Sequence, residues 1–434
     1  MTSVNVRELV LDILMEVNEK EQYSHLVIRD VLNKYQYLEK QERAFLTRLA
    51  EGTIEHMLEM DFIINSFSKV KVKKMKPLIR NLLRMNVYQI KYMDAIPDAA
   101  VCNEAVKLAK KRGFGQLRGF VNGVLRNIAR ELSHLQYPDE KLEPVRFLEV
   151  TYSVPEWMAK QWIQDYSFEK AKQICASFLA ERPITIRTNL LRIQPEDLKA
   201  KLETEGVRVK EVPALSYAFE ISGFDYLNSL ESFETGLFYV QDISSMMVAE
   251  LAAPKQGDYV IDVCAAPGGK STHLAEKMQG SGMVEARDLT EYKISLIEEN
   301  IMRHQCTNMK AVQMDATVLD ESSVGKADIV IADLPCSGLG VIRKKTDIKY
   351  KMTPDKMKSL VELQRDMLHT VCNYVKENGI LLYSTCTIHR GENEENVAWF
   401  LDKHPEFKLL SEQQILPQEE FGDGFFLAKM QKVK

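Results

Sequence analysis

Long apolar runs are absent from this sequence. None approaches the roughly 18 consecutive apolar residues that a membrane helix needs. The first residues, 1–8, also lack the basic flank and apolar core of a signal peptide. Cysteine is scarce, with 7 in 434 residues and no Cys-x-x-Cys pair, which argues against disulfides and zinc and for free thiols in a reducing compartment. We therefore expect a cytoplasmic protein without a membrane segment or a metal site.

A large excess of either charge is lacking too. The net charge is −5, from 57 Lys and Arg against 62 Asp and Glu, and by itself gives no indication of a nucleic-acid partner. The distribution is more informative, because residues 1–145 carry 23 basic against 19 acidic side chains, whereas the rest of the chain is net acidic. A basic region joined to an acidic remainder indicates two parts with different roles.

Residues 1–140 are predicted to form an all-α bundle. Apolar residues recur at helical spacing in three runs: Val6–Val17, Phe45–Met57 and Leu78–Ile90. Two polar stretches of this region, 69–76 and 107–130, are basic. They are either ordinary solvated faces or surfaces for nucleic-acid phosphates, from which Lys and Arg displace counterions.

The remainder of the chain is predicted to hold two further domains. Residues 145–235 indicate a small α+β domain, in which helices and short alternating strands are mixed. Residues 236–434 alternate between strands and helices, which predicts a doubly wound, mainly parallel α/β sheet. The strands expected in this last domain are 259–264, 283–287, 310–314, 328–333, 380–384 and 424–430.

A loop of small residues follows the first of these strands and precedes a helix. It reads Cys264, Ala265, Ala266, Pro267, Gly268, Gly269 and Lys270. Paired glycines let a backbone approach a ligand at a helix N-terminus. A Walker A phosphate loop matches at Gly269 and Lys270 but has Cys264 where its first glycine belongs, and the dinucleotide pattern Gly-x-Gly-x-x-Gly is absent. The third interpretation, S-adenosylmethionine, needs no phosphate cradle and is favoured.

Aspartates stand at the ends of four predicted strands: Asp262, Asp288, Asp315 and Asp333. Asp288 follows the second strand, where an acidic residue meets ribose hydroxyls in such sheets. Asp315 follows the third strand, from which a carboxylate can approach an adenine amino group. Each aspartate alone is more often a helix N-cap, but four at successive strand ends indicate a shared cofactor site.

Two cysteines, Cys336 and Cys386, follow two of the predicted strands closely. Ligands bind at the carboxyl ends of parallel strands, so both thiols are expected there, with Asp333 beside Cys336. Methylation of a pyrimidine at C5 needs such a set: a thiolate that adds to C6, a carboxylate that binds N3 and the exocyclic amine, and a base that removes the C5 proton. Otherwise both cysteines are small buried hydrophobic residues.

Several motifs carry a resemblance to a known family. The sequences at Asp333–Gly340 and Ser384–Thr387 resemble the two cysteine motifs of RNA 5-methylcytosine methyltransferases, and Cys264–Lys270 resembles their cofactor loop. Asn103–Val106 and Phe120–Arg126 resemble the NusB-like domain of one branch, the bacterial small-subunit ribosomal RNA methyltransferase B (Sun/Fmu) family. The similarity covers essentially the whole chain.

The resemblance implies a Rossmann-like class I methyltransferase domain, S-adenosylmethionine as the cofactor, and a cytosine of small-subunit (16S) ribosomal RNA as the substrate. It also implies that Cys386 is the nucleophile and that Cys336 assists product release, a choice that the residues alone do not make. A monomer is expected. Two other interpretations stay open: a non-catalytic NusB-like RNA-binding protein, and a P-loop NTPase that depends on Lys270.

Overall fold

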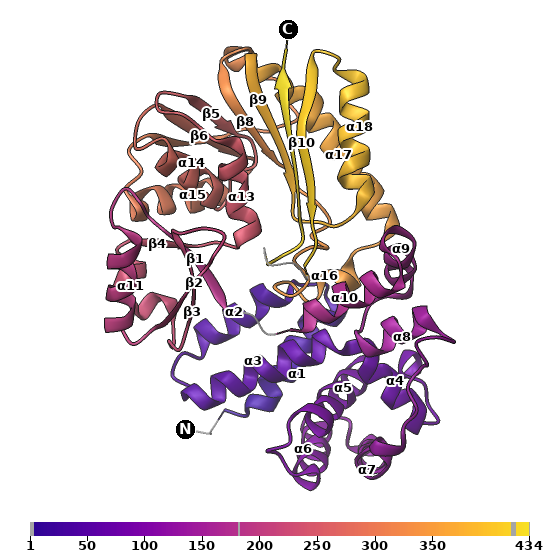
Figure 1. The fold of residues 1–434 in the computed structure, drawn as a ribbon. Coiled ribbons are helices and arrows are strands. Elements are labelled where there is room, and N and C mark those ends of the chain that lie inside the picture. The colour runs from indigo at the N-terminus through magenta and orange to yellow at the C-terminus, as the bar shows by residue number, and fades with distance from the viewer. Residues whose placement is uncertain (1–3, 181–182, 418–421, 434) are drawn as a thin grey trace. The chain divides into compact units, whose positions relative to one another are not determined.

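The computed structural model describes residues 4–180, 183–417 and 422–433. The chain divides into two compact units (Figure 1): Met1–Leu179 together with Ile342–Met352, and Ala180–Val341 together with Thr353–Lys434. A short segment from the later half of the sequence therefore belongs to the first unit. Within the described ranges, no helix has both the length and the apolar character required to cross a membrane.

The first unit is helical, as predicted. Its helices are α1 (Val6–Glu19), α2 (Ser24–Lys34), α3 (Lys40–Glu55), α4 (Met57–Phe67), α5 (Pro77–Tyr92), α6 (Asp98–Lys111), α7 (Arg118–Glu131), α8 (Pro144–Thr151), α9 (Glu156–Tyr166), α10 (Phe168–Leu179) and α16 (Ile348–Lys351), with 3-10 turns η1 (Val72–Lys74), η2 (Gly115–Leu117) and η3 (Leu132–His134). Pro77 and Pro144 begin α5 and α8, where a helix leaves an N–H unpaired in any case. Helices α8 to α10, which the sequence analysis assigned to the middle domain, pack with this unit.

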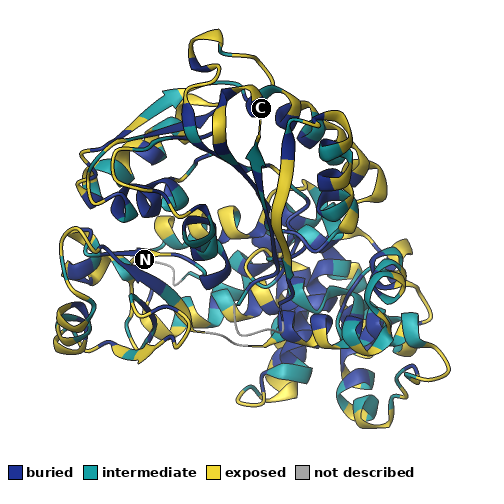
Figure 2. Ribbon diagram, turned by 45° about the horizontal axis from the view of Figure 1, so that its top comes forward, coloured by how far each residue is buried: buried dark blue, intermediate teal, exposed yellow. Residues whose placement is uncertain are grey.

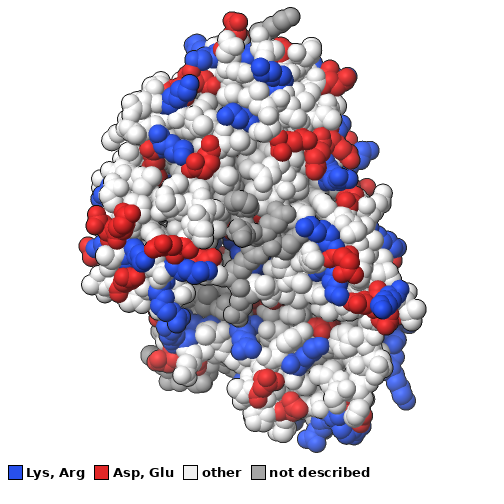
Figure 3. Space-filling model, viewed as in Figure 1, with Lys and Arg blue, Asp and Glu red and all other residues white. Residues whose placement is uncertain are grey.

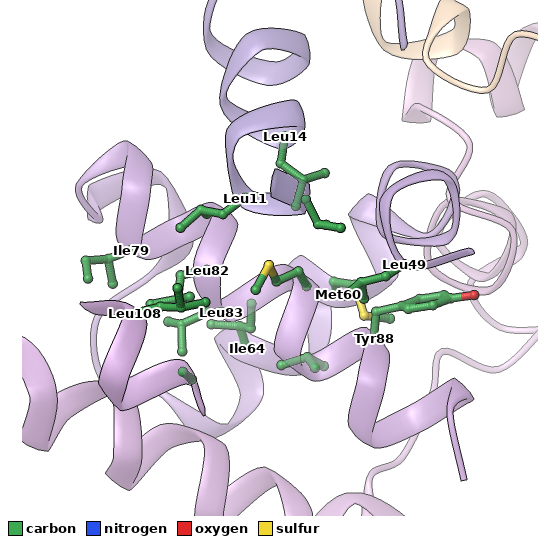
Figure 4. Close-up of a cluster of buried hydrophobic side chains, with 14 of the residues drawn as sticks. Leu11, Leu14, Leu49, Met60, Ile64, Ile79, Leu82, Leu83, Tyr88 and Leu108 are labelled. Atoms are coloured by element: carbon green, nitrogen blue, oxygen red, sulfur yellow. The ribbon is translucent and has the colours of Figure 1, made fainter. Parts of the chain in front are cut away.

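One apolar core holds the helical unit together (Figure 4). The buried side chains that meet there come from five helices: Leu11 and Leu14 of α1, Leu49 of α3, Met60 and Ile64 of α4, Leu82 and Leu83 of α5, and Leu108 of α6. The pairs in α1 and α4 stand three and four residues apart, which places each pair on one face of its helix. Each such side chain contributes about 1.5–3 kcal/mol relative to an exposed position.

The segment Ile342–Met352 packs into the helical unit through polar contacts. The Asp347 carboxylate accepts hydrogen bonds from the backbone N–H of Ser24 (3.0 Å) and from its hydroxyl (2.6 Å). The buried Lys349 Nζ donates to the carbonyl oxygens of Glu55 (2.8 Å) and Tyr152 (3.4 Å). Burial lowers the pKa of Lys349 to about 8, because desolvation disfavours the ammonium.

The second unit contains two sheets, of which the smaller has four antiparallel strands in the order β2-β3-β1-β4. Its elements are β1 (Ile184–Thr188), α11 (Pro195–Thr204), β2 (Arg208–Glu211), β3 (Ala218–Ser222), η4 (Leu227–Ser229), α12 (Glu231–Glu234) and β4 (Phe238–Val240). Strand β4 belongs to this sheet because its backbone pairs with β1. It lies beyond residue 235, the predicted end of the middle domain.

The larger sheet has seven strands in the order β10-β11-β9-β8-β5-β6-β7. Its elements are α13 (Ile243–Ala252), β5 (Tyr259–Asp262), α14 (Gly269–Lys277), β6 (Met283–Asp288), α15 (Glu291–His304), β7 (Met309–Gln313), η5 (Glu321–Ser323), β8 (Ala327–Asp333), α17 (Pro354–Val371), η6 (Cys372–Tyr374), β9 (Val375–Thr385), η7 (Arg390–Glu392), α18 (Glu394–Lys403), β10 (Phe407–Ile415) and β11 (Phe425–Lys432). The five strands from β9 to β7 run parallel to one another, as predicted. Strand β11 runs antiparallel to both of its neighbours, β9 and β10. Strand β10 was not predicted, because its mainly exposed polar residues at the sheet edge show no apolar pattern.

Both faces of this sheet are covered by helices, and its central strands are buried (Figure 2). Alternate residues of β8 enter different apolar clusters, with Val330 on one side and Ile331 on the other. Leu368 of α17 and Phe400 of α18 pack in the first cluster, and Leu274 of α14 packs in the second. This burial on both faces explains why the strands read as continuous apolar runs.

Arg187 of β1 links the small sheet to the start of α14. Its side chain is fully buried and forms a two-point ion pair with Glu276, at 2.8 and 3.1 Å. It also donates to the carbonyl oxygen of Gly269 (2.8 Å) and the hydroxyl of Thr272 (3.0 Å). Burial raises the pKa of Glu276, and the guanidinium counteracts this effect. The first turn of α14 is therefore held by a residue from the smaller sheet.

We expect Arg187→Ala to lower the free energy of unfolding of the second unit by about 3–5 kcal/mol, because it leaves a buried Glu276 without a partner. Hydrogen exchange measured by mass spectrometry along a urea series would report the two units separately. The double variant Arg187→Met/Glu276→Gln is the control, and it should lose less stability than Arg187→Ala. A loss below about 1 kcal/mol in Arg187→Ala, the range of an exposed pair, would contradict this assignment.

Lys349 should make the stability of the helical unit depend on pH. Its pKa in the folded chain is lowered to about 8, so the unfolded chain binds the proton more tightly, and the ionised side chain costs stability below pH 8. That cost of about 3 kcal/mol disappears as the pH rises from about 8 to 10.5. Relative to Lys349→Met, the unmodified protein should therefore gain stability across this window, as measured by hydrogen exchange of helical-unit peptides. Lys345→Met, which replaces an exposed lysine of the same segment and keeps Lys349, is the control, and its stability should follow that of the unmodified protein across this window.

Candidate active site

Two neighbouring strands bring the predicted thiols together. β8 and β9 pair in parallel with Asp333 opposite Ser384, so the residues that follow each strand meet at one edge of the sheet. The Sγ atoms of Cys336 and Cys386 are 3.3 Å apart. Neither cysteine forms a disulfide, and both are partly buried as whole residues. The structure thus brings together the two cysteines that the sequence analysis selected.

Hydrogen bonds connect the two loops that carry these cysteines. Ser337 and Thr387, which follow the two cysteines, share a hydrogen bond of 2.7 Å between their hydroxyls. Gly340 donates its N–H to the carbonyl oxygen of Cys386 (3.0 Å) and accepts the N–H of Gly424 (2.9 Å). A Cβ atom at Gly340 would lie 2.0 Å from the carbonyl oxygen of Gly424, so this close approach requires glycine.

A carboxylate and an ammonium lie at the same edge. Asp333 accepts a hydrogen bond from the Ser384 hydroxyl (2.8 Å), and its other oxygen pairs with Lys270 Nζ at 2.7 Å. Burial disfavours the Lys270 ammonium, but Asp333 outweighs this effect and, with smaller contributions from Asp262 and Cys386, raises the pKa of Lys270. Lys270 is therefore a firmly charged cation beside Asp333 and Cys386.

The two thiols face opposite charges. The hydrogen bond with the Cys386 sulfur, burial, and the negative charges of Cys386 and Glu392 hold the pKa of Cys336 well above its usual range. The cation Lys270, in contrast, interacts with Cys386. A cation stabilises a thiolate and a carboxylate destabilises one. Lys270 therefore provides a positive charge near the Cys386 sulfur, whereas the surroundings of Cys336 favour its protonated thiol.

The predicted cofactor loop connects β5 to α14. Gly268 closes the turn by donating its N–H to the Ala265 carbonyl oxygen (2.7 Å), and its φ of +106° is in the left-handed region that glycine adopts readily. The Ala265 N–H donates to the carbonyl oxygen of Arg287 (2.8 Å), which ties the loop to β6. Burial raises the pKa of the Cys264 thiol, so this cysteine is an unreactive packing residue.

Asp288 and Asp315 occupy different surroundings. The Asp288 carboxylate is 3% exposed and accepts hydrogen bonds from the N–H of Ala266 (3.0 Å) and from Lys293 Nζ (2.8 Å). The structure therefore places Asp288 against the predicted cofactor loop. Asp315 is partly exposed and accepts the N–H (2.8 Å) and hydroxyl (2.7 Å) of Thr317, and these bonds lower its pKa. Its carboxylate closes the turn that follows β7.

Asp262 offers an unsatisfied buried acceptor next to this loop. Its Oδ2 accepts a hydrogen bond from the Ser271 hydroxyl (2.5 Å), and its Oδ1 is buried with no hydrogen-bond partner among the described residues. Burial raises the pKa of Asp262 to about 7. A buried acceptor without a donor beside a turn of small residues fits a ligand that carries a positively charged donor group. No set of His, Cys, Asp and Glu side chains suited to a metal ion occurs in the described ranges.

Three buried polar residues around the thiols were missed by the sequence analysis. Glu392 accepts the N–H of Ser337 (2.8 Å), and Gln364 donates both to the Glu392 carboxylate (3.0 Å) and to the carbonyl oxygen of Pro335 (2.9 Å). Asn393 accepts the Thr385 hydroxyl (2.6 Å). In the sequence, Glu392 and Asn393 begin a polar run that is typical of a solvated helix start, so no apolar periodicity marks them as buried.

The basic stretches of the helical unit are exposed but partly neutralised. Four of their side chains form ion pairs within the unit: Lys107 with Glu104, Lys111 with Glu8, Arg112 with Asp12, and Arg130 with Glu131. In 69–76 the lysines are exposed while Val72 and Met75 are buried. Figure 3 shows basic and acidic side chains interspersed over the visible face. Only part of the basic charge is thus left for an outside partner.

Three stretches of the chain match the models of known protein families. Residues 249–431 match the family described as 16S rRNA methyltransferase RsmB/F. Residues 4–130 match the NusB family, and residues 154–224 match the RsmF/B-like ferredoxin-like domain. The all-α, α+β and Rossmann-like parts expected from the sequence are thereby confirmed as a fold class.

Full-length relatives carry one name. A Bacillus subtilis protein named probable ribosomal RNA small subunit methyltransferase B is 37% identical and is aligned over 100% of both chains. A Synechocystis protein of the same name is 29% identical over 99% of this chain and 100% of its own. The crystal structure of PH0851 superposes with a TM-score of 0.83 at 26% identity, covering 99% of each chain.

A second solved structure matches a smaller share of the chain. NSun6 from Pyrococcus horikoshii, solved with SFG, superposes with a TM-score of 0.58 at 25% identity and covers 63% of this chain and 97% of its own. Because a relative of 37% identity aligns from end to end, this chain belongs to the ribosomal RNA small subunit methyltransferase B family.

Proposed function

We propose that this protein transfers a methyl group from S-adenosylmethionine to C5 of a cytosine in small-subunit (16S) ribosomal RNA, through a covalent bond between Cys386 and C6 of the base. The observation that carries the proposal is the pair of thiols 3.3 Å apart, with a cation interacting with one and a carboxylate with the other. Family membership supports the same reaction class.

In this proposal Cys386 attacks as the thiolate. Lys270 stabilises the negative charge on its sulfur and also holds Asp333, at 2.7 Å. Asp333 then binds the exocyclic amine and N3 of the cytosine as the ring gains charge on addition at C6. The addition makes C5 nucleophilic, and S-adenosylmethionine supplies the electrophilic methyl group.

Cys336 assists the release of the product. The main reasons for its raised pKa are the hydrogen bond to the Cys386 sulfur and burial, followed by the charge of Cys386. Once Cys386 is bonded to C6, its negative charge is gone, and the pKa of Cys336 falls. The thiol of Cys336 can then release its proton to solvent, and the resulting thiolate takes the proton of C5. The electron pair of that C–H bond forms the C5–C6 double bond, and the bond between Cys386 and C6 breaks, which returns Cys386 to the thiolate.

The residues near β5 and β6 fit the proposed cofactor. The unpartnered Oδ1 of Asp262 suits the α-ammonium of S-adenosylmethionine. Asp288 lies against the loop from Cys264 to Lys270, where its carboxylate would bind the ribose hydroxyls. We assign Asp315 to the adenine amino group, since it follows the next strand of the sheet.

The two alternative functions fit these surroundings less well. In a P-loop NTPase, Lys270 would be left to bind phosphate, whereas here it is paired with Asp333. A non-catalytic RNA-binding protein would need neither two adjacent thiols nor the charges around them. In the proposed enzyme the exposed lysines and arginines of the helical unit bind RNA phosphates, and the enzyme acts in the cytoplasm.

Labelled methyl transfer is the direct test. The purified full chain should transfer a labelled methyl group from S-adenosylmethionine to small-subunit ribosomal RNA, and digestion of the product should yield 5-methylcytidine at one position. The position is the cytosine that is methylated in ribosomal RNA from the parent strain and unmethylated in RNA from a strain that lacks the gene. Incorporation into another base, or ATP hydrolysis that Lys270→Ala abolishes, would overturn the proposal.

The two cysteine variants should behave differently. Cys386→Ala should abolish both methyl transfer and any covalent RNA adduct, because no thiolate is left to add to C6. Cys336→Ala should accumulate an adduct that resists denaturation, because the bond forms but release fails. Denaturing gels with labelled RNA measure both results. Cys306→Ala, which removes a buried thiol elsewhere in the unit, is the control, and an adduct in Cys386→Ala would reverse the two roles.

A further inference from the structure

Two adjacent buried side chains, Glu392 and Asn393, lie between the two cysteine loops. They stand where η7 ends and α18 begins, and both are 0% exposed. Asn393 has no role in the reaction above, and Glu392 enters it only through its negative charge near Cys336. Glu392 bonds to a residue next to Cys336, and Asn393 bonds to residues next to Cys386. Glu392 also contacts the His389 ring through its other oxygen, Oε1, at 3.2 Å.

Glu392 holds the loop of Cys336 on both sides of that cysteine. Its Oε2 accepts the backbone N–H of Ser337, the next residue, at 2.8 Å. The same oxygen accepts the Gln364 side-chain amide at 3.0 Å, and that amide also donates to the carbonyl oxygen of Pro335, the preceding residue, at 2.9 Å. The peptide groups on either side of Cys336 are thus fixed by one carboxylate, directly or through Gln364.

Asn393 holds the loop of Cys386 in the same manner. Its Oδ1 accepts the hydroxyl of Thr385, the preceding residue, at 2.6 Å. Its Nδ2 donates to the carbonyl oxygen of Thr387, the next residue, at 3.1 Å, and to the Gln414 side chain at 2.7 Å. Asn393 is therefore bonded to both neighbours of Cys386.

We propose that Glu392 and Asn393 are positioning residues with separate tasks: Asn393 orients Cys386 for attack on C6, and Glu392 orients Cys336 for release of the methylated base. The inference rests on the function proposed above. Reactivity depends strongly on such orientation, since a displacement of about 1 Å can slow a reaction roughly 100-fold. The bonds of Glu392 and Asn393 are buried, so their loss leaves backbone groups unsatisfied and lets the loops move.

The test measures adduct formation and adduct breakdown separately, in the full chain, with small-subunit ribosomal RNA and S-adenosylmethionine under single-turnover conditions. Asn393→Ala should slow adduct formation about 10- to 100-fold, with adduct breakdown at the normal rate. Glu392→Ala should form the adduct at the normal rate and accumulate it, as expected for Cys336→Ala.

Conservative and control variants separate positioning from general damage. Glu392→Gln keeps an oxygen for the Ser337 N–H and should restore breakdown to within a few-fold of the unmodified protein. Gln364→Leu removes the bond to Pro335 but keeps Glu392, and it should also slow adduct breakdown. This variant replaces Glu392→Ala in the test if Glu392→Ala fails to fold. Glu395→Ala, an exposed position on α18, should change neither rate. The thermal unfolding of every variant is measured as well, to show whether a slow variant has also lost stability.

Four results would overturn the proposal. Glu392→Ala and Asn393→Ala could slow both steps by the same factor, which would show that they only support the fold, or they could affect the opposite steps. If Glu392→Gln is as slow as Glu392→Ala, the carboxylate acts through its charge and positioning is refuted. An unmodified protein that methylates cytosine without any Cys386-dependent adduct would instead refute the function proposed above, and the positioning roles with it.

Discussion

The parallel pairing of β8 with β9 is the interaction on which the candidate site depends. Its register sets Asp333 opposite Ser384, and the chain then reaches a cysteine within three residues on one strand and two on the other. A slip of one residue would shift the strands by about 3.3 Å and turn one of these side chains to the opposite face. The bonds from Gly340 to Cys386 and from Ser337 to Thr387 depend on the same register.

The charges around the thiols turn a nearly symmetrical pair into an asymmetrical one. Each cysteine follows a buried strand and is followed by a hydroxyl residue, and these two hydroxyls share a hydrogen bond. The difference comes from elsewhere in the chain: Lys270 comes from the helix after β5, and Glu392 from the turn after β9. Because Asp333 pairs with Lys270, the cation that favours a thiolate at Cys386 is held at the same point where the base would bind. In the proposed reaction, binding of the base and activation of the nucleophile therefore depend on one ion pair.

The sequence predicted those parts of the site whose positions follow from the pattern of the strands. Apolar runs located the strands, and the rule that ligands bind at their carboxyl ends predicted that Cys336 and Cys386 meet. The sequence could not predict which polar side chains are buried against a partner that is distant along the chain. Arg187 alternates in a short strand like any polar residue, and only the fold sets it against Glu276. The polar start of α18 has no pattern that distinguishes Glu392 from exposed Glu395, and the membership of Ile342–Met352 in the helical unit depends on contacts across more than half of the chain.

The path of the chain after Cys336 explains why so many bonds fix this loop. Directly beyond Val341 the chain leaves the second unit and packs in the first, where Asp347 and Lys349 anchor it. Any displacement of that segment would be transmitted along the backbone toward Cys336. Gly340 stands in between, and its N–H and carbonyl are bonded to Cys386 and Gly424 within the second unit. A loop fixed at Gly340 on one side and at Pro335 and Ser337 on the other keeps the spacing of the two sulfurs independent of the segment that follows.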